Sequence, residues 1–329
     1  MSVIDDGEWQ VPTPDEADDE GAFERAETRF RDRISDEPDA AYPPEPGRYH
    51  LYVSRACPWA HGAVLVRKLL GLADAISMDV VDPYRDERGW QFTPERAGCT
   101  PDTVNGADYL REVYERADPD YDGRVSVPVL WDRERGTIVN NESIEVMRML
   151  ATAFGHQRAG VDLYPPDRRD EIDHIVEAIY EPVNNGVYRA GFAESQAAYE
   201  AAVDDVFTAL ADLDALLGGQ RYLAGETLTL ADLRLFPTLV RFDEVYHTHF
   251  RCNRRRVEEY PNLWGYTREL YQLPGVAETV NMPHIKEHYY TTHDRLNPKR
   301  LIPVGPDPDF EAPHDRDRLP GGPPEALGV

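Results

Sequence analysis

The chain of 329 residues is long enough for two compact domains or one large one. Its 35 Lys and Arg residues stand against 61 Asp and Glu residues, which gives a formal net charge of −26. This charge argues against binding to a nucleic-acid backbone or to an anionic membrane, since both require a basic surface. The sequence has no apolar run of about 18 residues, as a membrane-spanning helix would need, and its acidic start predicts no signal peptide.

The scarcity of cysteine and of lysine indicates the cellular compartment in which the protein works. The cysteines are Cys57, Cys99 and Cys252, an odd and small number that predicts no disulfide framework and favours a reducing cytoplasm. Only three of the 35 basic residues are lysine. A strongly acidic chain with almost no lysine favours a salt-rich cytoplasm, where ions screen the self-repulsion. A GC-rich genome would account for the arginine but not for the acidic residues.

The chain begins with an acidic N-terminal extension over residues 1–45. Within it we expect a solvated acidic arm over 1–20, because so many like charges oppose a packed structure. Residues 21–35 are predicted to form a short helix, with Phe23 and Phe30 as its apolar points.

The next hundred residues alternate between strand and helix patterns. We expect, in chain order, a strand over 49–53, a helix from Pro58 to Gly71, a strand over 76–81, a helix over 106–118, strands over 125–132 and 137–139, and a helix capped by Asn140, Asn141 or Ser143. This β-α-β-α-β-β-α order predicts a thioredoxin-like α/β domain over residues 46–155.

The second half of the chain shows only helical patterns, which predict an all-α domain over residues 165–296. The run Tyr164-Pro165-Pro166 is the predicted linker before it. Thr229 to Asp232 form the pattern of a capping box, which begins a helix and carries no chemistry. The tail over residues 297–329 is rich in proline, so we expect no regular structure there.

Cys57, in the run Cys57-Pro58-Trp59-Ala60, is the strongest candidate for chemistry. It lies where a predicted strand passes into a predicted helix, so backbone N–H groups and the positive helix end both favour the nucleophilic thiolate. Ala60 stands where a resolving cysteine would be, so this thiol is expected to form mixed disulfides with a small thiol. The alternative is a buried and inert cysteine.

Two short motifs are candidates for recognising a peptide-like thiol. Pro128, at the start of a strand, denies a ladder hydrogen bond. In thioredoxin-like folds this proline is cis, and the backbone of the preceding residue, here Val127, is left to pair with a ligand. Ser143 and nearby N–H groups could hold a carboxylate at the helix start, while Glu142 could accept from an ammonium group. Together they would read the α-amino-acid end of a γ-glutamyl thiol; simple helix capping is the alternative.

This constellation resembles the glutathione transferase superfamily, which joins a thioredoxin-like domain to an all-helical one. More closely it resembles the glutathionyl-hydroquinone reductases, also called Xi-class transferases, an omega-like group. The resemblance spans about residues 20–306. Its motifs are GAFERAETRFRDRI, RYHLYVSRACPWAHGAVLVRKLLGL, GWQF, VPVLWD, NNESIEVMRM, VNNGVYRAGFA, RYLAGETLTLADLRLFPTLVRFDEVY and HIKEHYYTTHDRLNPKRLIPVGP.

The resemblance implies a two-step thiol reaction. The Cys57 thiolate would attack the sulfur of a glutathionyl-hydroquinone, release the hydroquinone and keep the thiol as a mixed disulfide, which a second thiol resolves. In the family, two tyrosines of the helical domain protonate the leaving group. The matching positions are Tyr188 and either Tyr289 or Tyr290.

The resemblance also implies a thiol-binding site. It places Trp90 over the glycyl side of the thiol, with Arg124 as a possible carboxylate partner, and Val127, Glu142 and Ser143 beside Pro128 on the γ-glutamyl side. The co-substrate is glutathione by resemblance, or γ-glutamylcysteine by the chemistry of a salt-rich cell. The family further implies a homodimer. The cytoplasm is expected from the scarce cysteines, and the negative charge predicts neither nucleic acid nor membrane as a partner.

Several other residues admit a functional and a structural interpretation. Tyr180 could line an aromatic pocket or belong to the core, and the structural interpretation is preferred for four histidines and four arginines. These are His247, His249, His284, His288, Arg251, Arg254, Arg255 and Arg256. Two rival functions also remain: a general glutathione or thiol transferase, of the conjugating or dehydroascorbate-reductase type, and a non-catalytic interaction module.

Overall fold

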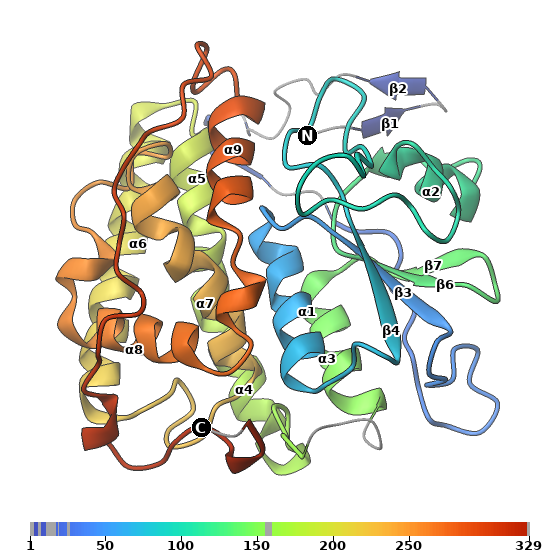
Figure 1. The fold of residues 1–329 in the computed structure, drawn as a ribbon. Coiled ribbons are helices and arrows are strands. Elements are labelled where there is room, and N and C mark those ends of the chain that lie inside the picture. Colours follow the sequence, from blue (N-terminus) through green and yellow to red (C-terminus); the bar gives the residue numbers. More distant parts are fainter. Residues whose placement is uncertain are drawn as a thin grey trace. The chain divides into compact units, whose positions relative to one another are not determined.

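The computed structural model describes residues 3–5, 8–10, 18, 20–24, 27–154 and 160–327. The chain divides into two compact units, each made of segments that are distant in sequence. The first comprises residues 1–15, 26–158 and 281–294, and the second comprises residues 16–25, 159–280 and 295–329. Figure 1 shows the elements of both units in sequence colours.

The first unit is built on a four-stranded mixed sheet with the order β4-β3-β6-β7. Its strands are β3 (Tyr49–Val53), β4 (Ile76–Val80), β6 (Val129–Asp132) and β7 (Thr137–Asn140), and its helices are α1 (Pro58–Leu69), α2 (Leu110–Ala117), α3 (Ser143–Ala153) and α9 (Met282–Thr292). β3 pairs parallel with β4 and antiparallel with β6, and β6 pairs antiparallel with β7. α1 and α3 pack together on one face of the sheet (Figure 1). The predicted thioredoxin-like order is confirmed.

Local sequence explains most of these elements. All five residues of β3 are buried, as expected for an inner strand whose two faces are both covered. Pro58 occupies the first turn of α1, where its missing N–H costs nothing, and Gly71 follows the helix at a φ of 65°, a conformation that glycine adopts freely. The predicted start and end of this helix are therefore confirmed.

Two elements are shorter than predicted. α2 begins at Leu110 rather than near residue 106, because Tyr109 is extended and the Leu110 N–H is bonded to the Trp90 carbonyl. β6 begins at Val129 rather than at 125, because the N–H and carbonyl of Ser126 are both bonded to the Tyr114 hydroxyl instead of to a neighbouring strand.

The N-terminal expectations are wrong in two places. β1 (Val3–Asp5) and β2 (Glu8–Gln10) form a three-stranded antiparallel sheet with β5 (Gly123–Arg124), and Ile4 is buried, so these residues are not a solvated arm. Backbone pairing and one buried apolar side chain offset the acidic composition. The rest of 1–20, apart from residues 18 and 20, lies outside the described residues.

The predicted helix over 21–35 is also wrong. The described residues 21–24 and 27–35 contain no helix. Phe23 instead packs on Phe192 within the second unit, with ring centroids 5.6 Å apart. Phe30 stacks on Tyr121 within the first unit, with ring centroids 5.5 Å apart. Tertiary aromatic contacts therefore override a weak local preference for helix.

The second unit is helical, as predicted. Its longer elements are α4 (Arg169–Ile179), α5 (Gly186–Phe192), α6 (Gln196–Gly219), α7 (Leu230–Arg241) and α8 (Pro261–Gln272), with π-helical turns η3 (Tyr180–Asn184) and η4 (Phe242–Tyr246) and short 3₁₀ turns η2 (Pro166–Arg168), η5 (Val257–Glu259), η6 (Ala277–Thr279), η7 (Arg316–Arg318) and η8 (Glu325–Leu327). The predicted capping box is present: Asp232 accepts from the Thr229 N–H at 2.8 Å, and Thr229 is the N-cap of α7.

The α9 segment and the C-terminal tail pack with different units. The C-terminal tail has only short 3₁₀ turns, but Arg316 is fully buried and donates to the backbone carbonyls of Leu217, Gln220 and Arg221. The α9 segment, residues 281–294, packs with the first unit rather than with the helical one. The predicted all-α boundary at residue 296 therefore includes a helix that belongs structurally to the other unit.

Candidate active site

Cys57 is the N-cap of α1, directly after the loop that follows β3. Its backbone is extended (φ −75°, ψ 121°), and its carbonyl accepts the first helical hydrogen bond from the His61 N–H at 3.0 Å. The thiol is partly exposed and donates to the Val127 carbonyl oxygen at a distance of 3.6 Å. A sulfur at a helix N-terminus lies at the positive end of the helix dipole, which stabilises a thiolate.

The Val127–Pro128 peptide bond is cis, in agreement with the expectation for a thioredoxin-like domain. The segment before it is fixed by Tyr114 of α2. The Tyr114 hydroxyl donates to the Ser126 carbonyl at 2.8 Å and accepts from the Ser126 N–H at 3.2 Å. It also accepts from the side-chain amide of Asn141 at 3.1 Å. Tyr114 therefore joins the segment before Pro128 to the segment before Glu142.

Glu142 and Ser143 begin α3, as the sequence predicted, but Glu142 itself is the N-cap. Asn140 accepts from the Glu142 N–H at 2.7 Å, and Asn141 bonds to Tyr114, so neither asparagine caps the helix. Thr28 donates to the Glu142 carboxylate at 3.4 Å. Glu142 itself is half-buried. A carboxylate and a helix N-terminus thus lie together in the same unit as Cys57.

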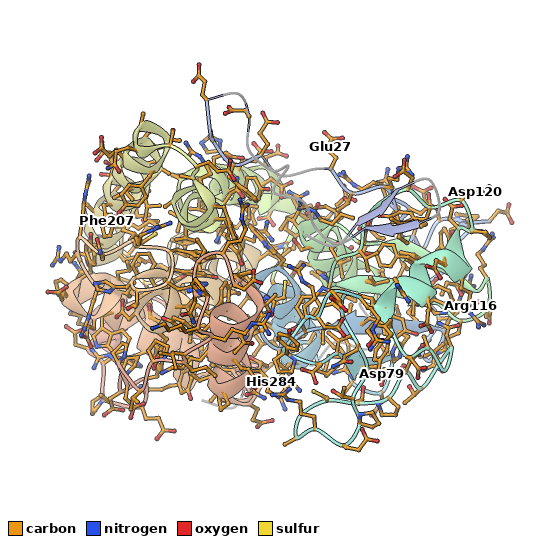
Figure 2. All side chains as sticks on the ribbon, turned by 90° about the horizontal axis from the view of Figure 1, so that it is seen from above. Glu27, Asp79, Arg116, Asp120, Phe207 and His284 are labelled. Carbon is orange, nitrogen blue, oxygen red and sulfur yellow. The ribbon has the colours of Figure 1, made fainter. Side chains whose placement is uncertain are left out.

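Trp90 lies in the loop after β4 and is buried. Its ring stacks on that of His288 of α9, with centroids 4.9 Å apart and planes inclined by 20°. His288 donates through Nδ1 to the Pro83 carbonyl at 2.8 Å, and His284, labelled in Figure 2, bonds through Nε2 to the Ala97 carbonyl at 2.8 Å. Both histidines therefore serve structural packing, as preferred from the sequence.

Two tyrosines, Tyr289 and Tyr290, follow His288 in α9 and belong to the first unit with it. Tyr289 and Tyr290 are both buried. The Tyr289 ring meets His288 and His293 edge-on, at centroid distances of 5.3 and 5.6 Å. The choice between the two tyrosines stays open. Arg124 is half-buried in β5, where its backbone pairs with Val3.

Tyr188, in α5 of the second unit, belongs to an aromatic cluster that sequence reasoning only partly found. Its ring lies 5.3 Å from Phe250, 6.0 Å from Tyr246 and 6.2 Å from Phe192. The sequence spacing could have indicated this cluster, because aromatic residues four apart lie on the same face of a helix. Tyr188 and Phe192 are four residues apart, as are Tyr246 and Phe250. Phe250 also fills the space over Gly191, where a Cβ would lie 2.4 Å from the ring.

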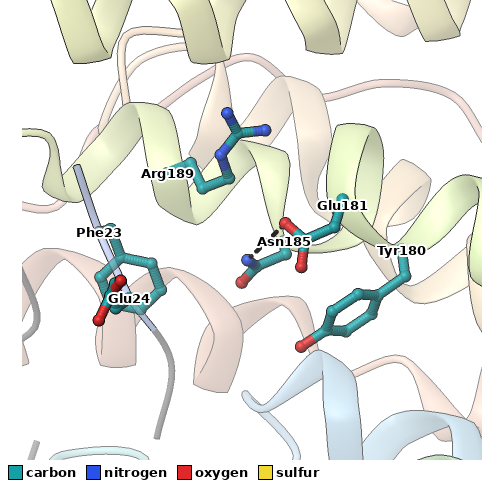
Figure 3. Close-up of a pocket in the computed structure, with 6 residues that line it drawn as sticks. All are labelled: Phe23, Glu24, Tyr180, Glu181, Asn185 and Arg189. Carbon is teal, nitrogen blue, oxygen red and sulfur yellow. Dashed lines mark hydrogen bonds between the residues drawn. The ribbon is translucent and has the colours of Figure 1, made fainter.

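Tyr180 lines a cavity of about 550 Å³ within the second unit, together with Phe23, Glu24, Glu181, Asn185 and Arg189 (Figure 3). Asn185 donates to the Glu181 carboxylate at 3.2 Å, shown as a dashed line. This lining is more polar than the aromatic pocket that the sequence analysis considered for Tyr180.

The other cysteines lack the setting of Cys57. Burial raises the pKa of the Cys99 thiol, and it raises the pKa of Cys252 to about 12. Thiolate is therefore disfavoured at both positions.

The remaining polar candidates are also structural. Burial lowers the pKa of His249 to about 4. Arg254 and Arg256 pair with Asp204 and Glu258, so the arginine cluster binds the chain's own carboxylates, as considered from the sequence. Among the described residues, no three His, Cys, Asp or Glu side chains gather as metal ligands would. In the same part of the chain no helix combines the length and apolar character needed to cross a membrane.

Comparison with known proteins gives two matching family models. The model described as "Glutathione S-transferase, N-terminal domain" matches residues 56–153, and that described as "Glutathione S-transferase, C-terminal domain" matches residues 196–269. The first match covers Cys57, α1 to α3 and the strands β4 to β7, and the second covers α6, α7 and most of α8.

Similar proteins are found at full length. The chain is 48% identical over 327 residues to glutathionyl-hydroquinone reductase YqjG from Escherichia coli, covering 96% of this chain and 99% of the relative. It is 47% identical to glutathionyl-hydroquinone reductase PcpF from Sphingobium chlorophenolicum, covering 93% and 96%. Among solved structures, the Xi-class transferase from Natrialba magadii is 58% identical, with 98% of each chain covered and a TM-score of 0.92. The glutathione-bound structure of YqjG has a TM-score of 0.88 at 46% identity, covering 96% and 99%.

Proposed function

Since the chain belongs to the glutathione transferase superfamily, among the glutathionyl-hydroquinone reductases of the Xi class, we propose that it reduces glutathionyl-hydroquinones with glutathione as co-substrate. The observation that carries the proposal is the position of Cys57, a partly exposed thiol at the N-cap of α1 that contacts the Val127 carbonyl. A cysteine there can become a nucleophile, whereas Cys99 and Cys252 cannot do so easily.

The first step of the proposed reaction forms a sulfur–sulfur bond. The Cys57 thiolate attacks the thioether sulfur of the conjugate, the carbon–sulfur bond breaks, and the aryl carbon takes up a proton to give the free hydroquinone. Cys57 is left in a mixed disulfide with glutathione. A second glutathione thiolate then attacks this disulfide, which releases glutathione disulfide and restores the Cys57 thiolate. One free glutathione is consumed for each conjugate, because its sulfur and the former thioether sulfur are together oxidised to the disulfide while the aryl carbon is reduced.

The carbon leaving group is the difficult part of the first step, because an aryl anion is a very poor leaving group. A phenol near the carbon could supply the proton. We assign this role to Tyr188 and to either Tyr289 or Tyr290, on the basis of the family motif GVYRAGF and HYYTTH. The burial of all three rings supports the assignment, since a phenolic proton is transferred best where water is excluded.

Thiol recognition is assigned to the surroundings of Cys57 in the first unit. The Val127 backbone beside cis Pro128 would pair with the peptide-like thiol on its γ-glutamyl side. Glu142 would accept from the ammonium group, and Ser143 with the start of α3 would hold the α-carboxylate. Trp90 would contact the glycyl side, with Arg124 as a possible carboxylate partner.

The acidic surface motivates a second part of the proposal. Glu27 and Asp120 are examples of side chains that project into solvent from the first unit (Figure 2). With a net charge of −26, such a surface suits a salt-rich cytoplasm, where γ-glutamylcysteine would be an alternative thiol. Glu142 and Ser143 would contact only the γ-glutamyl end, so this part of the site would serve either thiol. A homodimer is proposed from the family resemblance alone.

Intact-mass analysis in high salt tests the function. Wild-type protein, Cys57→Ala and the control Cys99→Ala are each mixed with glutathionyl-menadiol and, separately, with the γ-glutamylcysteine conjugate. We expect wild type and Cys99→Ala to gain one thiol and release the quinol, and Cys57→Ala to do neither. The faster conjugate identifies the preferred thiol. An unmodified Cys57 with both conjugates contradicts the mechanism and favours a non-catalytic module.

A further inference from the structure

The indole of Trp90 stacks on a side chain that is distant in sequence. His288 of α9 lies with its imidazole nearly parallel to the indole, at a centroid distance of 4.9 Å and an angle of 20°. The guanidinium carbon of Arg85 lies 5.7 Å from the centre of the same ring system. Stacked aromatic pairs of this kind stabilise one orientation of the ring beyond simple burial.

The imidazole of His288 is itself fixed in orientation. Its Nδ1 lies 2.8 Å from the Pro83 carbonyl oxygen, which can only accept, so Nδ1 carries the hydrogen. Both His288 and Pro83 are buried. The ring therefore cannot rotate away from Trp90 without losing a buried hydrogen bond.

The rest of α9 is bonded to the same loop. Glu287 pairs with Arg96, His284 bonds to the Ala97 carbonyl, and Thr292 accepts from the Arg85 N–H at 3.2 Å. These contacts fix the helix against residues 83–97 at several points. His288 differs from these three residues because its ring stacks on the Trp90 indole.

We propose that His288 is a positioning residue for thiol binding, which acts by holding the Trp90 indole in the orientation that receives the glycyl end of glutathione. The inference rests on the proposed function, because it takes Trp90 as part of the thiol site. It adds a residue that need not touch the thiol. It also implies that the thiol site and the tyrosine pair of α9 share one structural support, since His288 and Tyr289 are adjacent.

The test measures the dissociation constant of S-methylglutathione by calorimetry, because this probe has no free thiol to react with Cys57. His288→Asn keeps an amide donor near the Pro83 carbonyl but removes the ring. We expect this variant to bind about tenfold more weakly, the size of effect expected for losing a stacked pair. His288→Phe restores a flat ring and should bind within about threefold of wild type.

The matched control is His284→Asn. His284 is a buried histidine one turn earlier on α9, bonded to a backbone carbonyl as His288 is, but its bond is to Ala97 and not beside Trp90. We expect this variant to lose thermal stability comparably and to keep its affinity for the probe. Equal weakening by both substitutions would show a general effect of loosening α9 and would overturn the positioning role.

A double-mutant cycle with Trp90→Leu separates direct from indirect action. If His288 acts through Trp90, then His288→Asn changes the affinity little once Trp90 is leucine. If each substitution instead weakens binding by its own independent factor, so that the double variant shows the product of the two, the proposal is overturned. Wild-type protein that does not bind the probe at all contradicts the proposed function itself, whereas equal binding by wild type and His288→Asn overturns only the role of His288.

Discussion

The side-chain amide of Asn141 donates to the hydroxyl of Tyr114 at 3.1 Å, inside the first unit. The same hydroxyl is bonded to both backbone groups of Ser126. Two segments that are proposed to recognise the γ-glutamyl thiol, before Pro128 and before Glu142, are therefore fixed by one buried phenol. A residue outside the motif analysis thus supports the geometry of the candidate site.

Replacement of Tyr114 by phenylalanine should weaken thiol binding and lower stability together. The change leaves the half-buried N–H and carbonyl of Ser126 and the buried Asn141 amide without this partner, which costs about 1–3 kcal/mol of unfolding free energy. We expect a weaker S-methylglutathione affinity in calorimetry. Tyr121→Phe is the control, because among the described residues the Tyr121 hydroxyl is bonded only to the nearby Arg124 carbonyl, at 2.7 Å. Unchanged affinity in Tyr114→Phe would contradict this role.

Substitution of the two tyrosines of α9 should distinguish them. The phenol that donates the proton contributes to the chemical step, so its loss should slow quinol release about 100-fold or more. The other substitution should change the rate only slightly. Single-turnover mixing of Tyr289→Phe and Tyr290→Phe with glutathionyl-menadiol, followed by quinol absorbance, measures this. Wild-type rates in both variants would remove α9 from the chemistry.

Arg316 should be important for the stability of the second unit. Its guanidinium is fully buried, donates to three backbone carbonyls and lies 3.6 Å from the Glu269 carboxylate. Arg316→Leu removes the donor of the three carbonyls and one cation beside Glu269, which keeps its bonds from Arg221 and Tyr222. We therefore expect a loss of about 3–5 kcal/mol in urea unfolding. The control Arg318→Leu removes an exposed arginine of the same turn and should change stability by less than about 1 kcal/mol.

Asp243 should make the second unit less stable as the pH rises. Burial raises the pKa of Asp243 to about 6 from an ordinary value of 3.8, although two backbone N–H groups favour its carboxylate. The folded state therefore holds this proton more tightly than the unfolded state does. The stabilisation is complete below pH about 4 and is lost as the pH rises through about 6.

The variant Asp243→Asn isolates this contribution. Urea unfolding of both proteins between pH 4 and 7 gives the difference in free energy at each pH. We expect the wild type to lose stability relative to the variant across this range, whatever the constant offset between them. A difference that does not depend on pH would show that the carboxyl is already ionised at the acidic end.

Much of the first unit was predictable because its information is local. The apolar run of β3, the proline at the start of α1 and the glycine after it define a strand-to-helix junction, and that junction places Cys57 at a helix N-terminus. The capping box at Thr229 is local in the same way, since it joins residues three apart. Alternation and helical spacing therefore determined the fold class and the position of the candidate nucleophile.

Extended segments were harder to predict. The acidic composition of the first residues concealed β1, whose pairing with β5 joins positions about 120 apart in sequence. Residues 21–35 have helix-compatible composition, yet Phe23 and Phe30 are placed by aromatic partners that no local pattern reveals. In both cases contacts that are distant in sequence outweigh a weak local preference.

The sequence alone therefore determined which residue is the candidate nucleophile and which side chains surround the start of α3, because capping, periodicity and proline geometry act over a few residues. Only the tertiary structure decided that α9 packs with the thioredoxin-like unit and that His288 holds Trp90. The bond from His288 to Pro83 joins residues 205 positions apart. Such a contact depends on how a helix and a distant loop pack together in the folded chain. Hydrophobic spacing along the sequence predicts the elements but not this packing.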